Sequence, residues 1–473
     1  MGVAVLDTTT AQLVDFSLRF DESWLTDSVV RAAVDRVVDS VACAIVGYES
    51  EPGQIAVAAA RGVTCDAPAT VFGARLRTTP ELAAFANTTM VRTFDWNDGM
   101  LAQGGGHPSD MIAAVIAAGE AVHASGRDVL LGITLAYEVL GALGNAAPTR
   151  AKGFDQGTFM GVAAALGIGR MLGLDADQLA NAVSLAIVPH VPLRVNRTGL
   201  LSMWKGSATA SAMHSAIFAV RLARLGMTGP AEPFEGKTGV FDQTVGPFEA
   251  KLPANDDGRL VVEISHLKQF PAETHGQALL GLMPRVREWR SVDQIESIRI
   301  EAYWQAYHEI AMHPSKWDPT TRETADHSMP YLLAAALVDG GIDVRATFTP
   351  ERIADPALRP IMNKVSVTED KAFTAGFRPP GKGIAGEPRM RLIVTAVDGA
   401  TFIEEVGYHR GHSLNPMSRA EIDAKLDATS AGVLSDERRE AIRAAWWAVA
   451  DAPDICEPMA ATADFGADKE VAS

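Results

Sequence analysis

Residues 157–187 read GTFMGVAAALGIGRMLGLDADQLANAVSLAI, and this stretch decides the fold. Its apolar residues occupy nearly every face of a helix, which is typical of helices buried inside a multilayer helical body. It predicts helices over 157–172 and 176–186. Its glycine run from Gly167 to Gly173 has one residue too many for a dinucleotide-binding G-x-G-x-x-G and sits inside a helical pattern, so close helix packing explains it better.

Helical patterns continue on both sides of this stretch. Residues 25–48 repeat apolar side chains every three or four positions, and Pro80 suits the first turn of another helix. Ser109 and Asp110 are expected to cap a helix over 112–123. Further helices are predicted over 129–143, 207–225, 419–428 and 436–449.

The pattern changes near residue 255, where short β-branched runs begin. Helical stretches at 276–288 and 329–338 lie between these runs, so the region 265–405 is predicted to be a smaller α/β domain. Residues from about 455 onwards are expected to form a weakly ordered tail. The predicted strands are 260–264, 297–303, 364–368, 391–396 and 401–406.

Bulk properties exclude several classes of protein. A length of 473 residues favours two domains over one. A net charge of −16 leaves no basic surface for nucleic acid, so a site for an acidic substrate must gather a few cations locally. We find no secretory signal and no run long and apolar enough to span a membrane, and we therefore expect a cytoplasmic protein with no membrane partner.

The cysteines and the missing motifs argue against a metal. Cys43, Cys65 and Cys456 are odd in number and far apart, which disfavours both a disulfide framework and an iron–sulfur cluster. There is no H-E-x-x-H, C-x-x-C or calcium loop, and no G-x-S-x-G elbow. We expect a site without a metal.

Two acids and a histidine surround a glycine-rich loop. Asp95 and Asp98 lie in the segment FDWND, and His107 follows three consecutive glycines. A glycine run lets backbone and imidazole approach a ligand, and helix N-termini favour anions. The alternative, a capped turn with a solvated His107, stays open at this point.

Further basic residues interrupt an apolar segment. Arg194, Arg197 and Lys205 lie within VPLRVNRTGLLSMWKG, in a chain that is otherwise acidic. Arginine binds carboxylates through two parallel hydrogen bonds, and a lysine amine is a point charge that also moves protons. An ordinary solvated loop is the alternative.

Titratable residues gather in two later segments. KQFPAETH (268–275) contains Lys268, Glu273 and His275 where the helical part gives way to the α/β part, and interdomain clefts are common ligand sites. TRETADHSMPY ends at Tyr331, and its alternative interpretation is a capping network with Ser328 as the helix cap.

In this order, these loops resemble the 2-methylcitrate dehydratase (MmgE/PrpD) family over about residues 10–450. The fragments that carry the resemblance are FDWNDGM…HPSD, the stretch 157–187, GLLSMWKGSA, GMTGPAEPFEG, KQFPAETHGQ, TRETADHSMPY and NPMS. The resemblance implies a mostly α fold, in which a smaller α/β lid domain is inserted before the C-terminal helices of a large all-helical domain. The domains would be 1–264 with 406–455, 265–405 for the lid, and a tail at 456–473. It also implies a homodimer that needs no organic cofactor or metal.

Five residues match the family's motifs. Asp95 matches the first acid of its D-F-D-D-T segment, and His107 matches the histidine of H-P-S. Lys205 matches the lysine after R-x-G-x-x-S, Lys268 the lysine of K-x-F-P, and Tyr331 the tyrosine after H-S-x-x. We expect these five to be catalytic. The expected substrate-binding residues are Arg194, Arg197, Gln156, Glu273 and His275.

The chain departs from the family's pattern at three positions. Gly99 stands where related decarboxylases have threonine. Gln156 lies where other members place a histidine, and Glu273 replaces the histidine that follows F-P-A in decarboxylase-like members. These differences favour dehydration over decarboxylation and weaken the case for an unmodified methylcitrate specificity.

The expected activity is a cofactor-independent hydro-lyase acting on a small di- or tricarboxylate. His107 is expected to move the proton because its ordinary pKa lies near neutrality. Asp95 would orient it or handle the proton itself, and Tyr331 would protonate the leaving hydroxyl or hold a carboxylate. The alternatives are an iminodisuccinate-like epimerase, a cis-aconitate-type decarboxylase, and a carboxylate-binding protein that has lost its chemistry.

Overall fold

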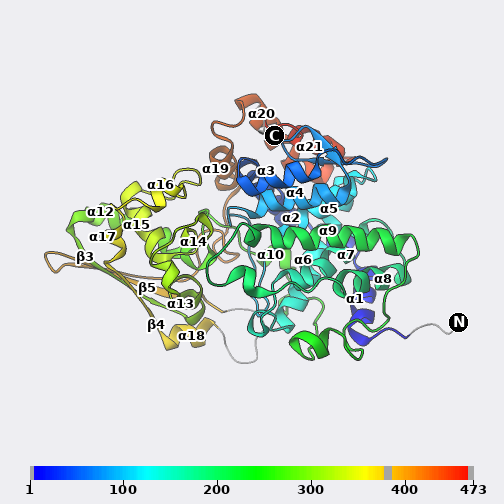
Figure 1. Ribbon diagram of the computed structural model, residues 1–473, viewed down its shortest axis with the longest axis horizontal. Coiled ribbons are helices and arrows are strands. Elements are labelled where there is room, and N and C mark those ends of the chain that lie inside the picture. Colours follow the sequence, from blue (N-terminus) through cyan, green and yellow to red (C-terminus); the bar gives the residue numbers. More distant parts are fainter. Residues whose placement is uncertain (1–4, 378–385, 467–473) are drawn as a thin grey trace.

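Two hydrophobic cores organise the protein. The computed structural model describes residues 5–377 and 386–466. A large helical body contains one core, and a smaller α/β unit, the lid domain, contains the other. Figure 1 shows the helical body on the right and the lid domain on the left. The mostly α fold expected from the sequence is confirmed.

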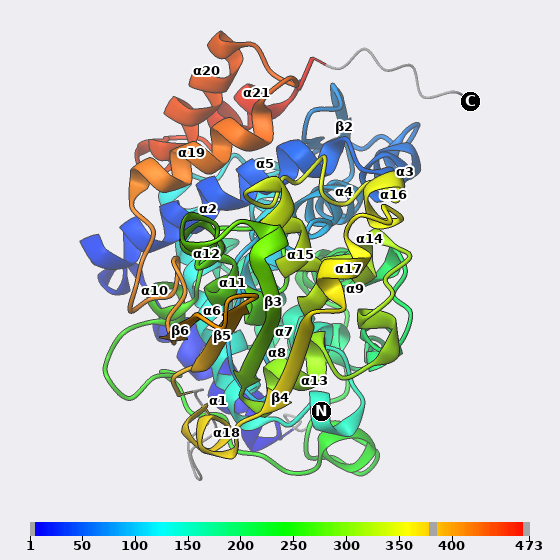
Figure 2. The same ribbon diagram turned by 90° about the vertical axis from the view of Figure 1, so that its left-hand side faces the viewer.

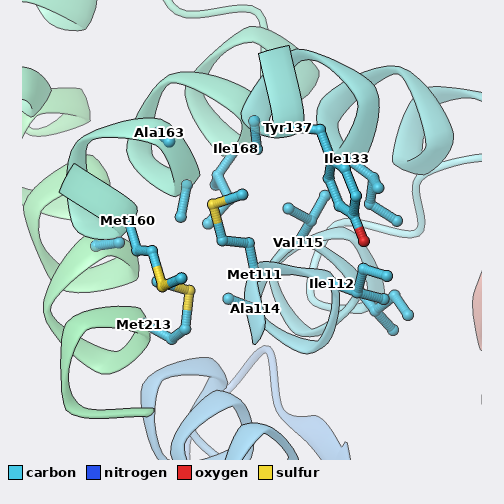
Figure 3. Close-up of a cluster of buried hydrophobic side chains, with 14 of the residues drawn as sticks. Met111, Ile112, Ala114, Val115, Ile133, Tyr137, Met160, Ala163, Ile168 and Met213 are labelled. Atoms are coloured by element: carbon cyan, nitrogen blue, oxygen red, sulfur yellow. The ribbon is translucent and has the colours of Figure 1, made fainter. Parts of the chain in front are cut away.

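The helix α7 (Gly157–Met171) lies at the centre of the helical body. Every residue from 157 to 169 is buried, as its apolar faces predict. Gly167 lets α7 approach α6 (Gly126–Ala146), because a Cβ atom there would lie 2.3 Å from the carbonyl oxygen of Gly132. Figure 3 shows Met111, Ile133, Met160 and other side chains filling the space between these helices.

Helices from both ends of the chain build the helical body. The C-terminal helices pack against α2 and lie above it in Figure 1, and a short hairpin of β1 (Ala69–Val71) and β2 (Leu76–Thr78) covers one edge. The helices are α1 Thr8–Arg19, α2 Asp27–Tyr48, α3 Glu51–Ala60, α4 Pro80–Arg92, α5 Ile112–Glu120, α6 Gly126–Ala146, α7, α8 Ala176–Ile187, α9 Trp204–Arg224, α10 Val261–Ile264, α19 Arg419–Ser430, α20 Asp436–Trp447 and α21 Cys456–Thr462.

The lid domain is built on a mixed four-stranded sheet in the order β4-β3-β5-β6. β3 pairs in parallel with β4 and antiparallel with β5, which pairs antiparallel with β6. Alternate residues of β5 are buried, so one face of the sheet packs on helices. Figure 2 looks onto the sheet, with the helical body behind it. The strands are β3 Ile295–Ala302, β4 Val365–Glu369, β5 Met390–Ala396 and β6 Thr401–Val406.

The helices of the lid domain are short apart from one. α15 is buried along most of its length, and Ser328 caps it by accepting a hydrogen bond from the amide of Tyr331 at 3.2 Å. The predicted helix over 276–288 is two helices separated at Gly281. The lid helices are α11 Gln277–Leu280, α12 Met283–Trp289, α13 Trp304–Ile310, α14 Arg322–Ala325, α15 Met329–Asp339, α16 Pro350–Ile353, α17 Arg359–Met362 and α18 Lys371–Phe377.

Two sequence-based predictions of local structure, at residues 260–264 and at Ser109 and Asp110, are wrong. Residues 260–264 form the helix α10, because the buried carboxylate of Glu138 accepts the amide of Val261 and Glu263 accepts that of Leu260. Ser109 and Asp110 are not caps but lie within a 3-10 turn that precedes α5. A short apolar run fits a strand and a helix equally well, so only the tertiary contacts distinguish them.

The chain end beyond residue 455 is not the weakly ordered tail that the sequence suggested. α21 buries Met459, and Phe465 is fully buried beneath Gly73 and against the ring of Tyr48. Only residues 467–473 of the predicted tail lie outside the described residues. A few apolar residues in a polar segment were enough to anchor it.

The helix α6 is long and apolar enough to cross a membrane. However, 89% of its most apolar window is buried inside the protein. This burial explains its composition, because a helix enclosed by α5, α7 and α10 needs no polar face.

Candidate active site

A polar pocket lies where the helical body meets the lid domain. The body supplies residues from the end of α4 to the start of α9, and the lid supplies Glu273, Glu309 and His327, which lie before α11, in α13 and after α14. Arg194 of the body pairs with Glu309 of the lid at 2.8 Å, so an ion pair within the pocket lining joins the two parts. The lining consists of five cations, Arg92, Arg150, Arg194, Arg197 and Lys205, three acids, Asp95, Glu273 and Glu309, and His107, His327, Gln156 and Leu201.

Asp95 is the centre of the charge cluster. Its carboxylate lies 2.5 Å from Nζ of Lys268, 3.1 Å from Nζ of Lys205 and 3.1 Å from Nη1 of Arg92. These cations hold the pKa of Asp95 well below its ordinary value despite the opposing effect of burial. This lowered pKa and the three short contacts favour a role for Asp95 in positioning the cations over a role in handling the proton.

The two lysines are fixed from both sides of the interface. Lys268 is fully buried and also donates to the backbone carbonyl of Asp95 at 2.7 Å. Lys205, in the first turn of α9, reaches across to Asp326 of the lid at 3.2 Å. Burial lowers the pKa of Lys268, and the Asp95 charge opposes that change. Both ammonium groups are thus held in place before any ligand arrives.

His107 lies in the pocket, but both of its ring nitrogens are occupied. Nδ1 lies 2.6 Å from the backbone carbonyl of Asp98, which can only accept, so Nδ1 carries the hydrogen. Nε2 is then the acceptor for Nη2 of Arg92 at 3.0 Å. Burial and the Arg92 charge lower the pKa of His107 well below its ordinary value. In this arrangement His107 anchors Arg92, and its lone pair is not available as a base.

His327 has the geometry of a base that His107 lacks. Its Nδ1 lies 2.5 Å from Oδ1 of Asp326, a distance that requires a hydrogen between them. Nε2 lies 3.4 Å from the Asp95 carboxylate and makes no hydrogen bond to any described residue. Burial and the charge of Lys205 lower the pKa of His327, so the ring is neutral at pH 7. A proton taken by Nε2 would be stabilised by the two flanking carboxylates.

The pKa of Glu273 is raised, whereas that of His327 is lowered. Burial and the Asp95 charge raise the pKa of this carboxyl group, against the effect of the nearby His327 and Lys268. Its backbone amide donates to the carbonyl of Asp326 at 3.0 Å, so it lies beside the His327 segment. An acid with a raised pKa next to a histidine with a lowered pKa is a pattern typical of paired acid–base catalysts.

Two further side chains that line the pocket are available for an anion. Nε of Arg150 donates to the carbonyl of Gly104 at 3.0 Å, and Arg150 forms no ion pair within the described ranges. Gly105, at φ +59°, admits this side chain, because a Cβ atom there would lie 2.4 Å from its guanidinium. The buried amide nitrogen of Gln156 has no hydrogen-bond partner among the described residues. The other arginines are engaged, Arg194 by Glu309 and Arg197 by Asp155 at 2.5 Å.

Two of the ten predicted site residues lie away from the pocket. The hydroxyl of Tyr331 donates to the carbonyl of Thr347, and the ring is fully buried in the core of the lid domain. His275 lies behind Glu273 and bonds to the hydroxyl of Tyr303. Tyr331 therefore cannot protonate a leaving group, and His275 does not line the pocket. Lys268 reaches the cluster from behind Asp95, and the pocket is lined by the other seven, Asp95, His107, Gln156, Arg194, Arg197, Lys205 and Glu273.

Gly99 has a structural explanation. Its amide and carbonyl pair with the backbone of His266 at 2.8 and 2.9 Å, and this pairing positions the segment that carries Lys268. A Cβ atom at Gly99 would lie 2.5 Å from Nε2 of His266. The glycine thus makes room for a histidine ring outside the pocket, so it does not indicate lost chemistry.

Sequence reasoning missed Arg92, Arg150 and His327. Arg92 is at the end of a helix, where a basic residue is ordinary, and Arg150 lies in the segment APTRAKG between helices. His327 is in a segment that the sequence did single out, but its neighbours suggested capping. The signal that the sequence did offer was a basic residue at or near the end of a buried helix, in a chain that is otherwise acidic.

Comparisons with known proteins show which family the chain belongs to. The family model described as the MmgE/PrpD N-terminal domain matches residues 11–253, and the MmgE/PrpD C-terminal domain matches residues 270–448. The 2-methylcitrate dehydratase of Cupriavidus necator is 30% identical over 370 residues, covering 73% of both chains. That of Salmonella typhi is 29% identical over 367 residues, 73% of this chain and 74% of its own. Human cis-aconitate decarboxylase is 25% identical over 439 residues, 88% of this chain and 87% of its own.

Proposed function

The chain belongs to the MmgE/PrpD family, and on that premise we propose that this hydro-lyase removes water from a small tricarboxylate, with 2-methylcitrate or a close relative as the substrate. The main support for this proposal is the charge of the pocket. In a protein of net charge −16, five cations and only three acids line a pocket between two domains. Such a pocket attracts a multiply charged anion against the mean field of the protein.

Arg150 and Gln156 are the proposed starting point of substrate binding. Arg150 has no carboxylate partner in the described part of the chain, and Gln156 offers an unused amide. A guanidinium binds a carboxylate through two parallel hydrogen bonds, which fixes orientation as well as charge. We place one substrate carboxylate on Arg150 and Gln156, with the acidic C–H directed towards His327.

Proton removal is the first chemical step. Nε2 of His327 takes the proton next to a substrate carboxylate, and the electron pair of the C–H bond is delocalised onto that carboxylate. We place this growing charge beside the ammonium group of Lys205, which Asp95 and Asp326 hold next to His327. A fixed donor of this kind is worth about 3–4 kcal/mol in a site that excludes water. Closure of the lid by the Arg194–Glu309 pair would supply that exclusion.

Water loss completes the reaction. The electron pair forms the C=C bond as the C–O bond breaks, and Glu273 gives its proton to the departing hydroxyl group. The products are the unsaturated acid and water, with His327 protonated and Glu273 ionised. Proton transfer from His327 back to Glu273 restores the starting state. Glu273 takes the role that the sequence assigned to Tyr331, because its pKa is raised by burial and it lines the pocket.

Real-time proton NMR in D₂O with the purified protein tests the proposal. We expect 2-methylcitrate to lose water and give an unsaturated product, and citrate to react more slowly. The panel also contains cis-aconitate, tartrate-like acids and iminodisuccinate. Loss of CO₂ from cis-aconitate would instead identify a decarboxylase, and deuterium entering an acid without water loss would identify an epimerase. No change in any of these acids would contradict catalysis on this substrate class.

Replacing Arg150 by methionine should weaken substrate binding. Hydrogen bonds to charged groups are worth about 1.5–3 kcal/mol, so KM is expected to rise by roughly 10- to 100-fold with a smaller change in kcat. The matched control is Lys152→Met, which removes a positive charge two residues away on the exposed surface. Equal KM values for the two variants in steady-state kinetics would rule out Arg150 as the carboxylate anchor.

A further inference from the structure

A histidine, an aspartate and a cysteine meet on the surface of the helical body, outside the active site. His123 follows α5, and Asp454 and Cys456 lie at the start of α21. Nδ1 of His123 is 2.8 Å from Oδ2 of Asp454 and 3.5 Å from Sγ of Cys456. The three ligand atoms all lie within 4.8 Å of one another.

This arrangement is not that of a catalytic triad. In a triad the acid and the nucleophile contact different nitrogens of the imidazole, so that a proton can be relayed through the ring. Here the carboxylate and the sulfur both contact Nδ1 of His123. The three polar atoms therefore converge on one point in space, as metal ligands do.

The spacing fits a tetrahedral zinc ion. With Zn–S about 2.3 Å, Zn–N about 2.05 Å and Zn–O about 2.05 Å, tetrahedral angles place sulfur and nitrogen about 3.5 Å apart and nitrogen and oxygen about 3.3 Å apart. The distance from Cys456 Sγ to His123 Nδ1 already has this value, at 3.5 Å. The distance from His123 to Asp454 is 2.8 Å, so it must lengthen by about half an ångström, a small change for an exposed imidazole.

The two segments that carry the ligands are already fastened together. The amide of Ile455 donates to the carbonyl of Ala124 at 2.9 Å. Oδ1 of Asp454 accepts the amide of Cys456 at 2.9 Å, which leaves Oδ2 facing the histidine. Besides its approach to His123, the thiol makes a long contact, 3.8 Å, to the carbonyl of Glu120. The His123 side chain is 71% exposed, so a fourth ligand position would open to water.

We propose that His123, Asp454 and Cys456 bind a zinc ion, with water as the fourth ligand, and that this ion fastens α21 to the end of α5. Motif searches miss such a site because 331 residues separate His123 from Asp454. Its ligand set of one sulfur, one nitrogen and one oxygen suits Zn²⁺ rather than Mg²⁺ or Ca²⁺, which prefer oxygen alone. The catalytic pocket is separate from it, so the dehydration chemistry does not depend on this ion.

Cobalt provides the test, because Co²⁺ bound to a thiolate gives an intense charge-transfer band in the near ultraviolet. The full-length protein is stripped with a chelator and titrated with Co²⁺. We expect the band to saturate at one equivalent and to vanish when Zn²⁺ is added. Cys456→Ser should abolish the band and His123→Asn should weaken cobalt binding at least tenfold, whereas Cys65→Ser should change neither.

Thermal unfolding gives a second readout. Zn²⁺ is expected to raise the Tm of the stripped wild-type protein and of Cys65→Ser, but not that of Cys456→Ser, because only a ligand that binds the folded state stabilises it. A charge-transfer band that survives in Cys456→Ser would contradict the proposal. So would the absence of any band in the wild-type protein, which would leave an ordinary His–Asp ion pair beside a free thiol.

Discussion

Replacing His327 by asparagine is expected to lower kcat by about 10²- to 10⁴-fold, the usual contribution of a positioned general base. The asparagine amide occupies the place of Nδ1 and can keep the hydrogen bond to Asp326, while the basic Nε2 is lost. The fold should therefore be unchanged, which circular dichroism and the unfolding midpoint would verify. Turnover of 2-methylcitrate is followed by the absorbance of the unsaturated product.

His107 supplies the matched comparison for this variant. In His107→Gln the amide oxygen can still accept the hydrogen bond from Arg92 that Nε2 accepts in the wild type. Because we assign His107 to positioning Arg92, we expect this variant to lose much less activity than His327→Asn. The reverse order, in which His107→Gln is nearly inactive and His327→Asn is active, would show that the base is His107 of the helical body and not His327 of the lid.

The pH profile of kcat/KM tests the assignment of His327 as the base and Glu273 as the acid. The pKa of His327 is lowered from 6.5, so the free base is present at neutral pH and is lost as pH falls through that lower pKa. The pKa of Glu273 is raised from 4.5, so the acid is lost as pH rises through its own pKa. We expect a bell-shaped profile whose acidic limb has a midpoint below 6.5 and disappears in His327→Asn. An acidic limb retained in that variant would contradict the assignment.

Removing the charge of Asp95 should have the largest effect on stability. Asp95→Asn leaves Arg92, Lys205 and Lys268 close together in a buried site without their shared anion. Breaking a buried ion pair in this way costs about 3–5 kcal/mol. We expect a large drop in the urea midpoint of unfolding, and loss of activity because Lys205 is no longer held in position.

A double variant tests whether Asp95→Asn lowers the stability because it leaves excess positive charge in the site, or because any substitution at this position is harmful. The single variant Lys268→Met leaves the carboxylate of Asp95 with two cations, Arg92 and Lys205. We therefore expect this variant to lose less stability than Asp95→Asn. In Asp95→Asn/Lys268→Met one excess positive charge is removed, and the loss of stability should be smaller than the sum of the two single losses. Strict additivity of the two losses would show that Asp95 and Lys268 do not act as a pair.

The helical body could be predicted from the sequence because its signals are strong and local. α7 and α8 were recognised from apolar faces that persist over several turns, and their bounds agree within a residue. Residues 260–264 were misassigned because five apolar and polar residues do not distinguish a strand from one helical turn. There the carboxylate of Glu138, distant in sequence, decided the outcome.

The candidate site was predicted in part, for reasons that Tyr331 and His327 make clear. Both lie in the segment TRETADHSMPY, and the resemblance to the family's H-S-x-x motif indicated Tyr331 as the catalytic residue. Ser328 caps α15 as one interpretation of the sequence required, and this cap fixes the first helical turn so that Tyr331 points into the lid core. His327, before the cap, is left facing the pocket. The rotation of a helix about its axis depends on packing partners that the sequence does not identify.

The arginines show a second limit of sequence reasoning. Arg194 and Arg197 were expected to hold substrate, yet each has a carboxylate partner, Glu309 and Asp155 respectively. Arg150 was overlooked, although within the described residues it forms no ion pair. Whether an arginine is free for a ligand depends on which acids the fold brings near it, and those acids are distant in sequence.

The most direct measurement is a crystal structure of His327→Asn with 2-methylcitrate bound. We expect a substrate carboxylate on Arg150 and Gln156, and the acidic C–H directed at the substituted side chain. With the imidazole restored in its wild-type position, that C–H should lie about 3–3.5 Å from Nε2 of His327. The leaving hydroxyl should face Glu273. A substrate bound with that C–H against His107, or outside the pocket between the helical body and the lid domain, would contradict this mechanism.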